Sequence, residues 1–98
     1  MNVNTTLGYQ SIQSTVSNTA VSLSDIGFTD DEIKRAGRCF VFINTNSIRV
    51  DWSGNDPTVS VGALISGSFE LTGNHNVERL KLIRDSTTDS EVFILLEG

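Results

Sequence analysis

The chain has 98 residues, a formal net charge of −5 at pH 7 and a sequence pI near 4.5. This length predicts a single domain, residues 1–98, with a hydrophobic core and a modest reserve of stability. The acidic balance argues against a nucleic-acid partner, which needs clustered Lys and Arg, and no apolar stretch is long enough to cross a membrane. Cys39 is the only cysteine, which excludes an intramolecular disulfide.

The N-terminal region is polar. Residues 1–8 show no hydrophobic pattern, and we expect them to form a flexible arm that orders on a neighbouring molecule. They also lack the basic region and apolar core of a signal peptide, so the protein is expected to remain in a reducing cytoplasm or in a particle assembled there. Residues 8–23 are rich in Ser, Thr and Val, which predicts one or two strands, and their weak hydrophobicity suggests a sheet edge.

One helix is predicted, within residues 25–37. Thr29 and Glu32 have the spacing of a capping box, in which each side chain bonds the free backbone N–H of the other residue. A helix of about two turns is too short to be stable by itself. We therefore expect it to dock on a sheet through Ile33 and Ala36.

Two strands, at residues 38–44 and 91–97, carry apolar side chains on both faces. One face of the first strand includes Cys39, where a buried thiol acts as a small hydrophobe. In a sandwich, the other face of a sheet normally meets water, so apolar residues there need a cover. Two covers stay open: the short helix alone, or the helix together with a subunit interface. The side chains that need this cover are Phe40, Phe42, Phe93 and Leu95.

Residues 48–73 alternate apolar and polar side chains in three runs separated by two turns, which predicts a three-stranded β-meander. The first turn is expected at residues 53–57, and Val59 and Val61 belong to the predicted middle strand. A polar connection is expected at residues 74–78. Together the elements predict a mainly all-β fold, a small antiparallel β-sandwich or barrel of about seven strands with one short α-helix.

The sequence shows no catalytic arrangement. His75, the only histidine, lies in a polar segment without an activated Ser or Cys beside it, and we expect it to be solvated. A glycosidase would need two carboxylates across a cleft, for which so short a chain has little room. The acids that flank the turns are therefore expected to be solvated: Asp51, Asp56, Asp85, Asp89 and Glu91. We predict that the protein is not an enzyme and has no catalytic residues.

No metal or cofactor is predicted either. A calcium loop could begin at Asp51, but Asp56 stands where glycine is needed, and Gly62 stands where a bidentate Glu is needed. One Cys and one His are too few for zinc, and no phosphate-binding glycine motif is present. Trp52 could stack on a sugar ring, although the favoured interpretation is a half-buried core position.

Several short motifs, spread over roughly residues 20–96, occur in an order that is similar to that of a known protein family. The sequence LSDIGFT leads into the short charged helix and the strand RCFVFI. These are followed by IRVDWSG, DPT, VG and FEL, at residues 48–54, 56–58, 61–62 and 69–71. In this order of motifs the chain resembles small virion structural proteins of tailed bacteriophages.

The resemblance implies a particle component without enzymatic activity. On this basis we expect a homo-oligomeric capsid decoration or cement protein, located in the virion and assembled in the host cytoplasm. Its partner would be the major capsid protein or another virion protein. The expected interface residues are Tyr9, Phe40, Phe42, Phe93 and Leu95. Two alternatives stay open: a host-surface or carbohydrate-recognition (fibre-base) module, and a head–tail or tail adaptor.

Overall fold

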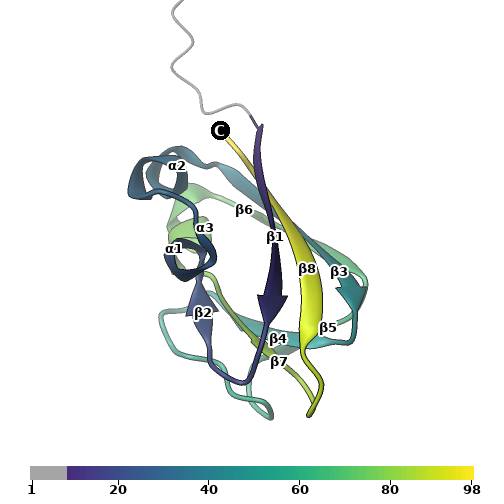
Figure 1. The fold of residues 1–98 in the computed structure, drawn as a ribbon. Coiled ribbons are helices and arrows are strands. Elements are labelled where there is room, and N and C mark those ends of the chain that lie inside the picture. Colours follow the sequence, from purple (N-terminus) through teal and green to yellow (C-terminus); the bar gives the residue numbers. More distant parts are fainter. Residues whose placement is uncertain (1–8) are drawn as a thin grey trace, which may run out of the picture.

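A computed structural model of the chain describes residues 9–98 as two four-stranded antiparallel sheets packed face to face (Figure 1). The first sheet has the order β1 (Tyr9–Val16), β8 (Ser90–Glu97), β3 (Arg38–Thr45) and β6 (Ser68–Thr72). The second has the order β2 (Val21–Ser22), β7 (Lys81–Arg84), β4 (Ile48–Asp51) and β5 (Ala63–Ile65). The predicted all-β antiparallel sandwich is confirmed, with eight strands in the described residues. The arm expected at residues 1–8 lies outside the described residues.

One hydrophobic core lies between the sheets. Every second residue of the central strands points into it, because strand side chains alternate between the two faces. Cys39 and Val41 of β3 are fully buried there, together with Val92, Ile94 and Leu96 of β8. The described residues therefore share a single core rather than two smaller ones.

The described residues contain three short helices instead of the one predicted: α1 (Leu23–Ile26), α2 (Asp30–Arg35) and α3 (Asn74–Arg79). The capping box of α2 is confirmed: Glu32 N donates to Thr29 Oγ1 (3.1 Å), and Thr29 N donates to Glu32 Oε1 (2.9 Å). Ser22 and Asp25 form a second capping box at α1, which the sequence analysis missed.

The segment predicted as a polar connection, residues 74–78, lies within α3. The N-cap residue of α3, Gly73, makes no side-chain cap, and Val77 is the one buried residue of the helix, so neither a cap nor a periodic pattern signals it. Asn74 Nδ2 donates to the carbonyl oxygens of Ile33 (2.9 Å) and Ala36 (2.8 Å). Helix α3 thus satisfies carbonyl groups at the end of α2, and these tertiary contacts hold the two helices together.

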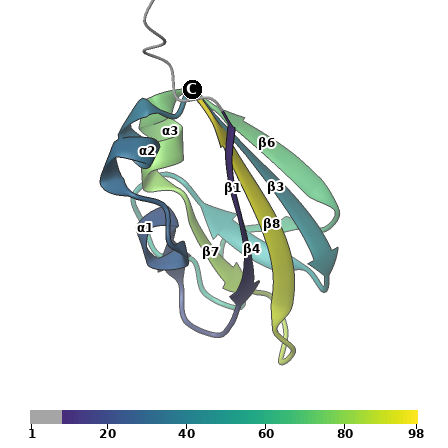
Figure 2. The ribbon, with the colours of Figure 1, turned by 45° about the horizontal axis from the view of Figure 1, so that its top comes forward.

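The helices pack against one side of the sandwich (Figures 1 and 2). Leu23, Phe28, Ala36 and Val77 are buried members of the core cluster, and Ile33 packs against it. Ile33 and Ala36 are in contact with the core as expected, but they meet it between the two sheets rather than on the outer face of one sheet. The apolar residues of the helices therefore face the shared core.

The predicted meander at residues 48–73 is wrong. β4 and β5 form a hairpin, but β6 leaves that sheet and pairs with β3 in the other one. The crossing occurs at Ser66 and Gly67, and Gly67 has a φ of 89°, which favours glycine. An alternating pattern identifies strands but carries no information about the sheet to which each strand belongs.

Candidate interaction face

Four apolar side chains lie together on the outer face of the β1-β8-β3-β6 sheet. Phe42 is directly opposite Phe93, and Phe40 is directly opposite Leu95, in the antiparallel register of β3 and β8. Directly opposed residues point to the same face of a sheet. Their neighbours in sequence, including Val41 and Ile94, fill the core on the inner face. We call Phe40, Phe42, Phe93 and Leu95 the apolar quartet.

The two phenylalanines of the quartet contact each other. The ring centroids of Phe42 and Phe93 are 6.1 Å apart with an interplanar angle of 43°, within the range of favourable aromatic pairs. Phe42 is 41% exposed, and Phe40, Phe93 and Leu95 are partly exposed. The quartet is therefore accessible on the surface of the described chain.

Polar residues border the quartet on both neighbouring strands. Ser11 and Gln13 of β1 are opposite Leu95 and Phe93, while Glu70 and Ser68 of β6 are opposite Phe40 and Phe42. All four bordering residues are exposed: Ser11, Gln13, Ser68 and Glu70. The face thus has an apolar centre and a polar rim.

Charged groups close both ends of this face. At one end, Arg38 Nε lies 3.6 Å from Glu97 Oε1 and 3.9 Å from Glu70 Oε2. At the other end, Thr15 Oγ1 donates a hydrogen bond to Glu91 Oε2. The rim therefore carries three carboxylates and one guanidinium, a net negative charge.

The helices do not cover the quartet. Both alternatives drawn from the sequence placed the short helix over part of this face, and the structure instead places Ile33 and Ala36 against the core between the sheets. The described helices therefore leave the outer face open, and the expected subunit interface stays a prediction. Tyr9 begins β1 opposite Glu97 in the register, and its side chain lies outside the described part of the structure.

The residues weighed for catalysis are not brought together. Cys39 is fully buried, and burial raises the pKa of its thiol from 9.0 to about 12, so the thiol is a poor nucleophile. His75 is exposed on α3 rather than in a loop. Within residues 9–98, no group of three or more His, Cys, Asp or Glu side chains is placed to hold a metal ion.

The turn acids, predicted from the sequence to be solvated, form ion pairs and hydrogen bonds in the structure. Three of them form ion pairs: Asp56 with Lys81, Asp85 with Arg49, and Asp89 with Arg84. Asp51 Oδ1 accepts hydrogen bonds from the hydroxyl and the backbone N–H of Ser53, both 2.7 Å long. Both hydrogen bonds lower the pKa of Asp51, and the one from the Ser53 hydroxyl is the larger cause. These carboxylates hold the turns to neighbouring segments.

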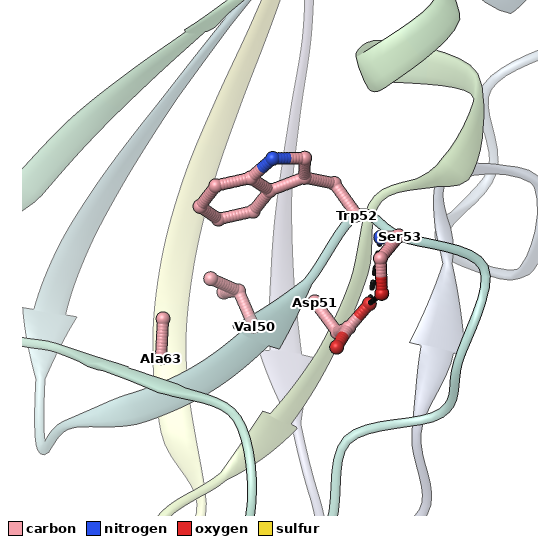
Figure 3. A pocket seen from close by; sticks show the side chains of 5 residues that line it. All are labelled: Val50, Asp51, Trp52, Ser53 and Ala63. Atoms are coloured by element: carbon pink, nitrogen blue, oxygen red, sulfur yellow. Dashed lines mark hydrogen bonds between the residues drawn. The ribbon is translucent and has the colours of Figure 1, made fainter.

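Trp52 lies beyond the end of β4 and borders a shallow pocket of about 220 Å³ (Figure 3). The indole extends over Val50 in Figure 3, and the pocket is also lined by Asp51, Ser53 and Ala63. Trp52 is 37% exposed and is not a member of the core cluster, so the core position favoured from the sequence is wrong.

Three further apolar residues are exposed, which the sequence did not predict. Val59, Val61 and Leu64 are 43%, 64% and 54% exposed. Val59 and Val61 precede β5 and lie in the connection 52–62, where Thr58 and Val61 form an isolated bridge. The pattern Val59-Ser60-Val61 alternates apolar and polar residues, as a half-buried strand does. The sequence therefore gave no signal that this segment is a surface connection.

None of the helices among the described residues is both long and apolar enough to span a membrane. A scan against protein-family models, a search of curated proteins and a search of solved structures each found no match to the chain. The geometry of the outer face and the motif order in the sequence are therefore the grounds for a functional proposal.

Proposed function

We propose that this chain is a non-enzymatic structural protein of a tailed-bacteriophage virion, most specifically a capsid decoration or cement protein. The observation that carries the proposal is the apolar quartet on an outer sheet face that no described helix covers. An apolar centre within a polar rim is the usual anatomy of a protein–protein interface. The phage assignment is supported by the order of motifs across residues 20–96.

The mechanism of such a protein is mechanical. A protein that binds only the assembled shell stabilises that shell by mass action, in proportion to the logarithm of its free concentration. In this proposal the quartet docks on the major capsid protein or another virion protein. The acidic rim selects a partner surface with an apolar centre and basic surroundings, because opposite charges attract across the interface and like charges disfavour wrong partners.

Counting copies of the chain in purified particles tests its place in the virion. Particles are produced from the genome that encodes the chain, and its amount is measured against the major capsid protein by quantitative mass spectrometry. A copy number comparable to that of the shell subunits supports capsid decoration. A few copies per particle favour the head–tail or tail adaptor instead, and absence from purified particles overturns the virion proposal.

Substitution on the outer face tests the docking surface. The variant Phe42→Ser is added to particles made without the chain, and bound protein is measured across a concentration series. Phe42 contacts Phe93 and is the most exposed member of the quartet, so binding should weaken by about tenfold or more. The matched control is Leu64→Ser, an exposed apolar residue on the other sheet, which should bind like the unmodified chain. Equal binding by the two variants would show that the outer face is not the docking surface.

Carbohydrate recognition is the second candidate, and the pocket beside Trp52 favours it. An exposed indole can stack on a sugar ring, and the Asp51 carboxylate can accept sugar hydroxyl hydrogen bonds. A glycan array distinguishes the two candidates. Saturable binding that is lost in Trp52→Ala and kept in Phe42→Ser would support recognition of a host surface, and an array without any binding would remove this candidate.

A further inference from the structure

The free edge of β1 is unusual among the sheet edges of the described chain. β1 is eight residues long and pairs with β8 along its whole length, from Tyr9 opposite Glu97 to Val16 opposite Ser90, without a register shift. It is the terminal strand of its sheet, as Figure 2 shows, and among the described residues no other strand pairs with it. Its second edge therefore presents backbone N–H and C=O groups to whatever lies beside it.

The other three edges carry the usual protection against unwanted pairing. β2 and β5 have two and three residues, which is too short for a stable added strand. β6 has five residues and carries the exposed charge of Glu70. β1, with the sequence YQSIQSTV, has neither a charged residue nor a proline. Proteins normally block a long regular edge with one of these devices, so an unblocked edge is suited to pairing.

We propose that β1 pairs with β1 of a second copy of this chain, antiparallel about a two-fold axis. Self-pairing places the same segment on both sides of the contact, as an isologous dimer requires. Each copy has a net charge of −5, yet this segment contributes no charge, so the contact brings no like charges into opposition. Its exposed Ser11 and Gln13 present uncharged polar groups that can hydrogen-bond across the new strand pair.

The dimer would join two four-stranded sheets into one continuous sheet. A two-fold axis perpendicular to that sheet keeps both outer faces on the same side, so two apolar quartets would share one surface. Two linked binding faces bind a repetitive partner more tightly than one face does. The pairing itself does not rest on the proposed function, because it concerns only the purified chain.

Sedimentation equilibrium of the purified chain over a wide concentration range tests the proposal. The unmodified chain should dimerise reversibly. Ser11→Lys combined with Gln13→Lys puts lysines on both sides of the contact and should weaken dimerisation by about tenfold or more. The matched control, Ser68→Lys with Thr72→Lys, adds the same charge to exposed outer-face residues of the opposite edge strand, β6, and should leave dimerisation unchanged.

A strict monomer at every concentration overturns the proposal, as does a dimer that the β1 variant leaves intact or that both variants weaken equally. If the β1 variant fails to fold, hydrogen exchange of the unmodified chain decides the question. Amide protection in β1 should rise with protein concentration, while protection in β6 should not. Failure of these tests leaves the particle experiments, which concern a different surface, unaffected.

Discussion

Adjacent residues of one strand have opposite environments in this protein. In β3, Val41 is fully buried in the core, and the next residue, Phe42, is 41% exposed on the outer face. The same change occurs in β8 between buried Ile94 and partly exposed Phe93. The apolar quartet therefore belongs to the surface, although its sequence context is as hydrophobic as that of the core.

The two environments predict different losses of stability. Ile94→Ala removes a fully buried side chain and should lower the free energy of unfolding by about 2–5 kcal/mol. Phe42→Ala removes an exposed side chain, and the loss should stay near about 1 kcal/mol, mostly from the contact with Phe93. Urea unfolding followed by circular dichroism measures both. A loss in Phe42→Ala as large as that in Ile94→Ala would show that the outer face is packed rather than free.

The buried thiol of Cys39 predicts an alkaline loss of stability. Burial raises the pKa of the folded thiol to about 12 from 9.0, so the folded state favours the protonated form. This contribution is fully present below pH 9 and is lost as the pH rises from 9 toward 12, because the unfolded chain releases its proton first. Chemical unfolding at a series of pH values should show a smaller alkaline loss in Cys39→Ala than in the unmodified chain. Parallel pH profiles for the two proteins would contradict this prediction.

Short elements are held by specific polar contacts as well as by the core. Two capping boxes begin α1 and α2, and Asn74 of α3 binds carbonyl groups at the end of α2. The connection 52–62 is fastened in a similar way. Arg49 donates to the carbonyl oxygens of Val59 (3.2 Å) and Gly62 (3.0 Å), and its Nε lies 3.0 Å from Asp85 Oδ1. The Arg49 guanidinium thus links the connection 52–62 to β4, on which Arg49 lies, and to the turn that follows β7.

Removal of this guanidinium should loosen the connection without unfolding the sheets. In Arg49→Met the two carbonyl oxygens lose a charged donor, and we expect a loss of about 2 kcal/mol in the free energy of unfolding. Hydrogen exchange should accelerate at the N–H of Thr58, which bonds to the carbonyl oxygen of Val61 in the same connection. Arg79→Met, at an exposed arginine of α3, is the control and should leave that exchange rate unchanged. If the Thr58 N–H exchanges as slowly in Arg49→Met as in the unmodified chain, contacts within the connection 52–62 are enough to hold it in place.

At the scale of the whole molecule, the chain passes repeatedly from one sheet to the other. Consecutive strands lie in different sheets at every step except the β4–β5 hairpin. The helices α1 and α2 join β2 of one sheet to β3 of the other, and α3 joins β6 to β7. Neither sheet can form from one continuous part of the chain, so both depend on the same core.

This interleaving predicts a single cooperative unfolding transition. Trp52, the only tryptophan, follows β4 in the second sheet, while circular dichroism reports on the strands of both sheets. The urea transitions measured by tryptophan fluorescence and by circular dichroism should therefore coincide. Separate midpoints would show that one sheet unfolds before the other.

The sequence by itself determined features that depend on residues close together in the chain. The capping box of Thr29 and Glu32, the alternation of strands β3 and β8 and the resulting all-β fold class were all predicted correctly. The identity of the apolar quartet also follows from this alternation. Such features depend on steric and hydrogen-bond preferences within a few residues, which the sequence displays directly.

Only the tertiary structure decided how these elements combine. It assigned β5 and β6 to different sheets, formed α3 from a segment with no cap, and exposed Val59 and Val61 in a surface connection. It also placed the helices against the core, which left the outer face without a described cover. These outcomes depend on which strands and helices of the whole chain bury one another best. Alternative pairings of distant elements compete, and a local sequence pattern does not show which of them is the most stable.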